Sequence, residues 1–319
     1  MVPDSISDLI AARSAQIIET RRFFHGIPEL GFEENETGKA IADRLTAAGL
    51  AVETGIGKTG LVAVLEGIKP GPRLMIRADI DGLPVDELTG LDFASTNGRM
   101  HACGHDGHIT IAVTAAEILA AMKDQLAGTL IFVFQPAEEV VMGALAMIDD
   151  GLFEKYPADR VIGTHLWNQI PTGTIGVNRA TVFASADQFR LTVHGKGGHG
   201  AMPHKTIDPV AAIAEIITTA QTVVSREVPP NEMGVLTFGQ IHGGSAPNVI
   251  ADSVTVEGTV RAYTAETRIL IMQALERIAN NVAAAMRATT SFERIHGAPP
   301  VINDSEVAAW VTRQASLAV

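Results

Sequence analysis

Short apolar runs alternate with longer segments of helical periodicity along the first 180 residues, and this alternation constrains the fold more than any other feature. The strand-like runs lie at 61–67, 73–78, 129–135 and 160–165, and helices are expected near 5–24, 36–49, 107–123 and 140–150. Continuous apolar strands separated by helices are typical of a sheet that helices bury on both faces. The pattern therefore predicts an α/β domain over residues 1–182 with a mixed, mostly parallel sheet.

The rhythm of the sequence changes after residue 182. Strand-like, helical, strand-like, strand-like, helical and strand-like segments follow one another at 188–195, 209–225, 234–243, 253–263, 265–287 and 290–297. The order β-α-β-β-α-β is that of the ferredoxin-like unit, which is a complete small domain. A second, α+β domain is therefore expected at 183–295, inserted before a short segment, 296–319, that returns to the first domain as a helix.

The overall charge and the single cysteine exclude several classes of protein. The formal net charge is −12, from 24 Lys and Arg against 36 Asp and Glu, whereas binding of a nucleic-acid backbone requires clustered cations. No apolar run approaches the roughly 18 residues that a membrane span needs, and the first 25 residues have the mixed charge of an amphipathic helix instead of a secretion signal. One unpaired cysteine fits a reducing compartment. A cytoplasmic location is expected, with no nucleic-acid or membrane partner.

Polar side chains follow the predicted strands at the points where the strands end. Asp79 and Asp81 follow 73–78, and Glu138 and Glu139 follow 129–135, while His165 ends 160–165 and the segment MHACGHDGH (100–108) precedes a predicted helix. In open α/β sheets, functional groups gather beyond the carboxyl ends of the strands. Thiolate, imidazole and carboxylate are ligands of zinc and similar divalent metals. The candidate ligands are Cys103, His105, Glu139 and His165.

Each candidate also has a simpler structural interpretation. A lone cysteine is commonly a small buried apolar residue, His165 could be a hydrogen-bonded core histidine, and Asp79 and Asp81 could brace loops or orient a ligand. His101 and His108 fit loop and helix-start positions better than ligand positions. No GxSxG or GxGxxG fingerprint follows a strand, and GIGKTG (55–60) lacks the first glycine of a phosphate-binding loop.

Seven ordered motifs resemble one enzyme family, the amidohydrolase branch of the dinuclear metallopeptidases (peptidase family M20). The motifs are HGIPELGFEE (25–34), RADIDGLPVDE (77–87), MHACGHDGH (100–108), FQPAEE (134–139), GTHLW (163–167), GKGGHGAMPH (195–204) and SAPNVIAD (245–252). This branch contains hippurate hydrolase and deacylases of N-acyl amino acids and N-acetyl-diaminopimelate. The resemblance implies a zinc-peptidase-like catalytic domain with an inserted lid domain that also forms a homodimer.

The resemblance also implies a role for individual residues. Cys103, His105, Glu139 and His165 fall on metal-ligand positions for two divalent ions, which could be Zn, Mn, Co or Ni, and Glu138 falls on the general base. We expect Asp79 to support the ligands. His199 falls on a histidine that crosses into the partner subunit's active site, and Asn248 and Arg261 fall where the substrate carboxylate is held. The expected reaction is hydrolysis of hippurate-like or N-acetyl amino acids by a metal-activated water.

One departure from the family pattern leaves alternatives open. The family supplies a further histidine ligand from a C-terminal motif, which does not occur before Val319, so truncation of a genuine enzyme is expected. The first alternative is a non-catalytic relative that binds a small acid and has lost the last ligand. The second makes Cys103 a thiolate nucleophile activated by His105 or His165, without any metal.

Overall fold

A computed structural model of the chain describes residues 6–317, which form two compact units. The first unit ends at Pro171 and the second begins at Thr172. The predicted domain boundary at residue 183 and the predicted return of 296–319 to the first domain stay predictions. No helix within 6–317 has both the length and the apolar character that crossing a membrane requires.

The first unit is a helix-flanked mixed sheet, as the sequence predicted. Its helices are α1 (Ile6–Ala12), α2 (Ser14–His25), α3 (Asn35–Ala47), α4 (His105–Ala121), the short η1 (Lys123–Gln125), α5 (Gly143–Asp149) and α6 (Leu152–Lys155), and its strands are β1 (Ala51–Ile56), β2 (Gly60–Glu66), β3 (Lys69–Asp79), β4 (Ala127–Gln135) and β5 (Arg160–Gly163). The strand order is β1-β2-β4-β3-β5. Strand β3 is parallel to both β4 and β5, whereas β2 pairs with β1 and β4 in antiparallel fashion.

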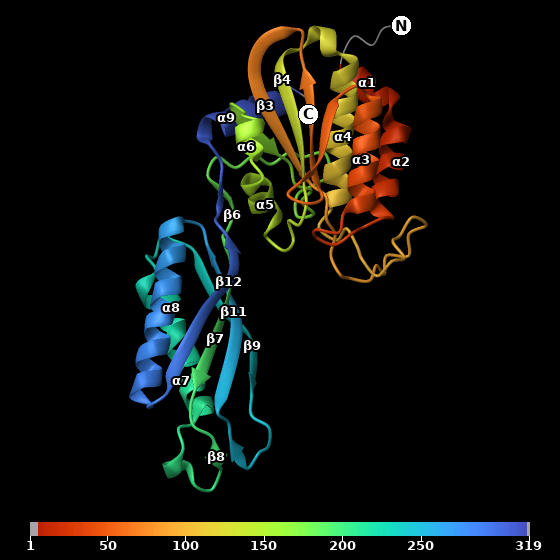
Figure 1. The fold of residues 1–319 in the computed structure, drawn as a ribbon. Coiled ribbons are helices and arrows are strands. Elements are labelled where there is room, and N and C mark those ends of the chain that lie inside the picture. The colour runs from red at the N-terminus through yellow and green to blue at the C-terminus, as the bar shows by residue number, and fades with distance from the viewer. Residues whose placement is uncertain (1–5, 318–319) are drawn as a thin grey trace. The chain divides into compact units, whose positions relative to one another are not determined.

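Helices cover both faces of this sheet because its central strands are apolar on both sides. Along β4, Phe132 and Phe134 face the core formed with α2, α3 and α4, whereas Ile131 and Val133 face the core formed with α5 and α6. Successive side chains of a strand point to opposite faces, so one continuous apolar run supplies both cores. Figure 1 shows α2, α3 and α4 together on one side of β3 and β4, with α5 on the other.

Several boundaries differ from the sequence-based expectation. The helix predicted at 5–24 is divided at Arg13 into α1 and α2, and residue 5 lies outside the described residues. Strand β1 was missed because, at the sheet edge, only one of its six residues is buried and it has no continuous apolar run. Helix α4 is buried around most of its circumference, but Ile111 is 44% exposed. The helix expected at 140–150 is shortened to α5.

The second unit contains the predicted β-α-β-β-α-β arrangement. It consists of β6 (Thr181–Phe183), β7 (Ala186–His194), β8 (Gly198–His199), η2 (Pro203–Lys205), α7 (Pro209–Thr222), a π-helical turn η3 (Val223–Glu227), β9 (Gly234–Gly243), β10 (Val249–Ile250), β11 (Ser253–Ala262), α8 (Ala265–Ala285), β12 (Thr289–Ala298), β13 (Val301–Ile302) and α9 (Ser305–Ala315). The main sheet has the order β12-β7-β11-β9, and all its pairings are antiparallel.

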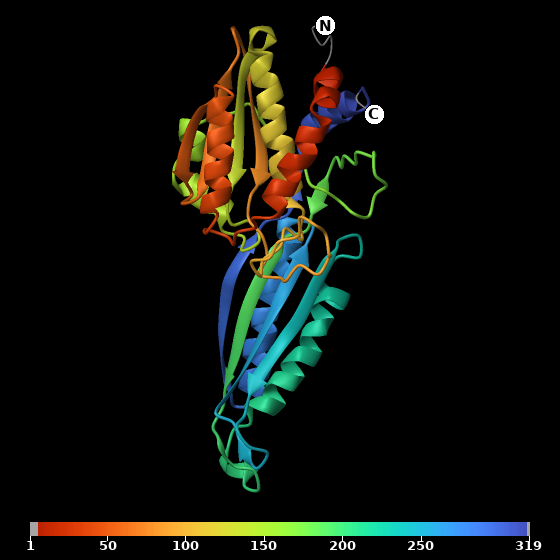
Figure 2. The same cartoon turned by 90° about the vertical axis from the view of Figure 1, so that its right-hand side faces the viewer.

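Helices α7 and α8 pack together on one face of the four-stranded sheet, as the two views show (Figures 1 and 2). Phe189, Leu191 and Val193 alternate along β7 toward these helices and are fully buried. Arg190 and Thr192 lie between them on the other face, where Arg190 forms an ion pair with Glu257. The period-two pattern of β7 therefore specifies which face of the sheet the helices cover.

Candidate metal centre

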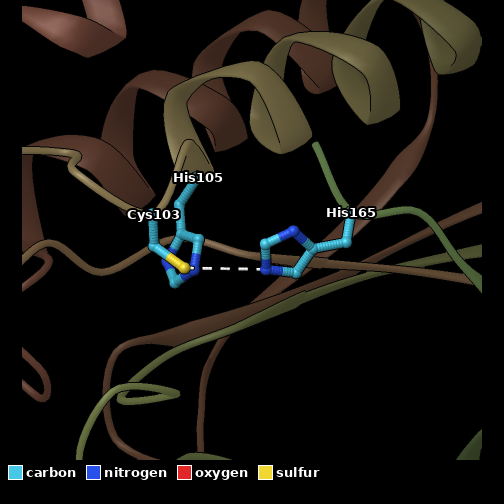
Figure 3. A group of neighbouring side chains, drawn as sticks. All are labelled: Cys103, His105 and His165. Carbon is cyan, nitrogen blue, oxygen red and sulfur yellow. Dashed lines mark hydrogen bonds between the residues drawn. The ribbon is translucent and has the colours of Figure 1, made fainter. Parts of the chain in front are cut away.

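Cys103 and His105 lie at the start of α4, on either side of a left-handed glycine. Gly104 has φ +88° and precedes the first helical residue, His105. A glycine takes this conformation without the steric penalty of a side chain. Figure 3 shows the Cys103 thiol and the His105 imidazole close together where this helix begins. The first turn of a helix also favours a thiolate over a thiol.

His165 approaches this pair from the segment that follows β5. Its Nε2 atom lies 3.6 Å from Cys103 Sγ, the contact marked in Figure 3. The next residue, Leu166, packs so closely on α4 that a Cβ added at Gly107 would lie 2.4 Å from Leu166 Cδ1. Both glycines of the CGHDGH segment therefore have a structural role: one shapes the turn, and the other admits the segment that carries His165.

Glu138 and Glu139 complete the cluster from the turn that follows β4. Glu138 Oε2 and Glu139 Oε1 each lie 3.9 Å from His105 Nε2. Possible ligand atoms of Cys103, His105 and His165 all lie within 4.8 Å of one another, and the same holds for those of His105, Glu138 and Glu139. Because both groups contain His105, the structure brings the four predicted ligands and the predicted base into one site.

Asp81 holds both His105 and the backbone at Glu139 in place. His105 Nδ1 lies 2.9 Å from the Asp81 carbonyl oxygen and 3.2 Å from its Oδ1, and the other carboxylate oxygen accepts a hydrogen bond of 2.9 Å from the Glu139 backbone N–H. Acceptors at Nδ1 place the proton there, so that Nε2 is the nitrogen available to a metal. One buried carboxylate thus fixes both His105 and the turn bearing Glu139.

Asp79 and His108 form a second buried brace. Asp79 accepts hydrogen bonds from Arg77 Nη1 at 2.7 Å and His108 Nδ1 at 2.5 Å, and it lies 3.5 Å from His105 Nε2. His108 Nε2 accepts a hydrogen bond of 2.8 Å from the Leu166 N–H. Both nitrogens of His108 are therefore used, so that His108 supports the Leu166 segment and is not free to be a ligand.

His101 is a buried side chain that is neutral at pH 7. This side chain is 4% exposed, and neither ring nitrogen has a hydrogen-bond partner of good geometry among residues 6–317. Burial lowers the pKa of His101 to about 4, so that the ring is neutral at pH 7. The sequence indicated a possible brace at Asp81, but it gave Arg77 no role and placed His108 only at the start of a helix. The signal for Arg77 and Asp81 is their position two residues before and two residues after Asp79, where β3 ends.

The charges of the site favour a bound cation. Burial works to lower the pKa of His105, but the hydrogen bond to Asp81 and the nearby carboxylates raise it to about 11. The His105 and His165 rings lower the pKa of the Cys103 thiol. Burial raises the pKa values of Glu138 and Glu139, which lie close together. The anionic groups therefore hold a second proton on the His105 ring, and a metal bound at Nε2 would replace that proton.

Two buried atoms show that a divalent metal fits these residues. His105 Nε2 and Glu139 Oε1 are buried and have no hydrogen-bond partner within 6–317. Two ligand atoms on one zinc ion, each about 2.0–2.3 Å from it, are at most about 4.5 Å apart. The separations of 3.9 Å for His105 and Glu139 and of 3.6 Å for Cys103 and His165 meet this limit.

The remaining three predicted site residues lie in the second unit. His199 in β8 is paired with Val249 of β10, and the Gly200 N–H donates a 2.8 Å hydrogen bond to the Asn248 carbonyl, so that His199 and Asn248 are neighbours. Arg261 is near the far end of β11, which begins at Ser253. At about 3.3 Å per residue, Arg261 is roughly 26 Å along β11 from Ser253, and Asn248 precedes that end of the strand.

Several known proteins are similar to this chain in both sequence and fold. The model of a family described as peptidase family M20/M25/M40 matches residues 75–318. The chain is 39% identical over 308 residues to the N-acyl-L-amino acid amidohydrolase of Geobacillus stearothermophilus. This alignment covers 96% of this chain and 83% of that protein. It is 40% identical over 297 residues to the N-acetyl-L-cysteine deacetylase of Bacillus subtilis. That alignment covers 93% of this chain and 71% of the deacetylase.

A solved structure extends this similarity to three dimensions. The YXEP protein of Bacillus subtilis, described as a dinuclear metal binding peptidase from the M20 family, is 34% identical and superposes with a TM-score of 0.82. The match covers 96% of this chain and 80% of that one.

Proposed function

This chain belongs to peptidase family M20/M25/M40, and we propose that it hydrolyses the amide bond of N-acyl amino acids with the help of bound divalent metal. Membership of this family makes the chain a hydrolase that acts on amides. Its relatives include an N-acyl-L-amino acid amidohydrolase, an N-acetyl-L-cysteine deacetylase and an N-acetyldiaminopimelate deacetylase. These names support a small substrate that has an acyl group on the nitrogen of an amino acid.

The observation that carries this proposal is the cluster of donors around His105. Cys103, His105, Glu139 and His165 would hold the metal, and two ions per chain agree with the dinuclear relative. When bound, divalent metal lowers the pKa of a water molecule and polarises the amide carbonyl. The mixture of thiolate, imidazole and carboxylate accepts Zn, Mn, Co or Ni, so that availability decides which is used.

Glu138 is the proposed general base. Its carboxylate is close to the cluster, 3.9 Å from His105 Nε2, and its side chain is 40% exposed, so that water and substrate can reach it. It would take a proton from the attacking water and deliver it to the departing amine nitrogen. Burial and the Asp79 charge raise the pKa of Glu138 toward the value that suits this exchange.

We propose that catalytic His199 and substrate-binding Asn248 and Arg261 act in sites shared between two copies of the chain. Arg261 offers a planar fork for the carboxylate of the amino acid product, and Asn248 can donate to the same group. Because these residues are separated by most of β11, one chain cannot place both on one small carboxylate. We therefore propose that Asn248 and His199 act in the site of the partner subunit, where His199 donates a hydrogen bond to the developing oxyanion.

The direct test compares the wild-type chain with Glu138→Gln after loading with Mn²⁺ or Zn²⁺. Hydrolysis of N-acetyl amino acids and hippurate is followed by release of the free amino acid. We expect kcat to fall by roughly 10²–10⁴ while the metal content stays the same. Glu36→Gln, a change of an exposed glutamate on α3, is the matched control and should keep wild-type turnover. Equal turnover by Glu138→Gln and wild type would remove the assigned base.

The short contact between Cys103 and His165 also favours a second mechanism, in which the thiolate attacks the amide directly. This mechanism needs no metal. Activity that survives strong chelation and is abolished by alkylation of Cys103 would support it. Loss of activity on chelation, with recovery on addition of Mn²⁺ or Zn²⁺, would support the metal mechanism.

A further inference from the structure

The turn that carries the glutamate pair has an unusual backbone. Ala137 has φ +48° and Val141 has φ +60°, and Ala137 is completely buried. Left-handed conformations of residues other than glycine cost about 1–3 kcal/mol and persist where surrounding contacts enforce them. The conformation of the turn therefore requires specific partners outside it.

Two buried carboxylates hold the backbone on either side of Glu138. The N–H of Ala137 donates a 2.7 Å hydrogen bond to Glu34 Oε1, and the N–H of Glu139 donates a 2.9 Å hydrogen bond to Asp81 Oδ2. The residues Glu34 and Asp81 are both 0% exposed. The Pro136–Ala137 and Glu138–Glu139 peptide groups are thus both held, and the Ala137–Glu138 peptide lies between them. Asp81 also binds His105, whereas the donors to the Glu34 carboxyl group are Thr59 and Ala137.

Glu34 is itself fixed by its surroundings. The Thr59 hydroxyl, between β1 and β2, donates a 2.5 Å hydrogen bond to Glu34 Oε2. Gly31, three residues before Glu34, packs directly against the turn, because a Cβ added to it would be 3.0 Å from Ala137 Cα. Burial raises the pKa of Glu34, which shows the cost of placing a carboxyl group here. A side chain needed only to fill space would be apolar, so that hydrogen-bond acceptance is the property that the site uses.

We propose that Glu34 is a positioning residue for amide hydrolysis, because its carboxyl group holds the left-handed turn that aims Glu138 into the metal centre. This inference rests on the proposed function, in which Glu138 is the base. Displacement of a reacting group by about 1 Å can reduce the rate by roughly 10²-fold. The Ala137 N–H is the link between Glu34 and that displacement.

The experiment compares four variants of the full chain loaded with Mn²⁺. Glu34→Leu removes the acceptor, Glu34→Asp retracts it, Glu34→Gln retains it, and Thr59→Val removes the second donor while leaving the Ala137 hydrogen bond intact. The measurements are kcat, KM, metal content, and hydrogen exchange of a peptide spanning 134–142. Glu34→Leu and Glu34→Asp should lower kcat by roughly 10–100-fold with KM and metal content near wild type. Exchange of the peptide should become faster in the same two variants.

Glu34→Gln and Thr59→Val should remain within about threefold of wild type in kcat, since both keep the Ala137 acceptor. Wild-type kcat and wild-type exchange in folded Glu34→Leu or Glu34→Asp would overturn the proposal, as would loss of kcat that only follows loss of metal. If Glu34→Leu does not fold, Glu34→Asp decides. If the wild-type chain hydrolyses no N-acyl amino acid, the proposed function fails, but the exchange of 134–142 still decides whether Glu34 holds the turn.

Discussion

His105 connects the protonation of the site with metal binding. Its surroundings raise the pKa of His105 to about 11, so that both ring nitrogens carry a proton at pH 8 in the absence of metal. The group is protonated below its raised pKa, and a metal can bind Nε2 only when that proton leaves. The charges around His105 therefore make metal binding dependent on pH.

We predict that each chain releases at least one proton as Mn²⁺ or Zn²⁺ binds at pH 8. Apparent affinity should increase about tenfold per pH unit for each proton released, because protons and metal compete for the same atoms. Calorimetry in two buffers of different ionisation enthalpy measures this number. Binding enthalpies that do not depend on the buffer, together with equal affinity at pH 7 and pH 9, would contradict the prediction.

At the scale of single elements, the beginning of α4 depends on the close approach of Leu166 to Gly107. We predict that Gly107→Ala destabilises the protein by about 1–3 kcal/mol, because the added methyl group would meet Leu166 Cδ1 at 2.4 Å. Displacement of Leu166 would also move His165, so that metal content should fall. Gly26→Ala is the control, because its Cβ would meet only ordinary contacts of 3.6 Å or more.

The main sheet of the second unit is tied to α8 by a buried acid. Asp187, which is 0% exposed, binds Arg268 through two hydrogen bonds of 2.6 and 2.8 Å and lies 2.7 Å from Arg294. Asp187→Ala should cost roughly 3 kcal/mol, because it leaves the largely buried Arg268 without its partner. The midpoint of thermal unfolding measures the effect. Asp43→Ala, which breaks an exposed ion pair with Lys39, should leave the midpoint unchanged.

At the scale of the whole molecule, the separation of Asn248 from Arg261 makes shared active sites testable. We predict that His199→Ala and Arg261→Ala are each nearly inactive alone, but recover activity when the two proteins are mixed and allowed to exchange subunits. In a mixed dimer one site would receive both intact residues, so that roughly a quarter of wild-type activity should return. Additive, near-zero activity of the mixture would show that every site is built from a single chain.

The sequence by itself determined the order of the elements and the chemistry available to them. Apolar runs such as 129–135 specify strands buried on both faces, and the period-two pattern of β7 specifies the covered face of the second sheet, because both signals are local. The edge strand β1 escaped prediction, since half-exposed strands have no strong apolar pattern. The motifs around Cys103, Glu138 and His165 indicated a metal site through the chemistry of their side chains.

The resemblance predicted which ligands share a site, but the tertiary structure alone decided the distances between them and which residues hold them. Cys103 and His165 are 62 positions apart, and Glu34 and Ala137 are 103 apart, so that no local pattern in the sequence reveals either contact. The same is true of His108, whose two ring nitrogens are occupied only because β3 and the Leu166 segment converge on α4. Hydrogen bonds and metal ligation depend on distances of a few ångströms, and only the packing of the sheet and helices determines those distances.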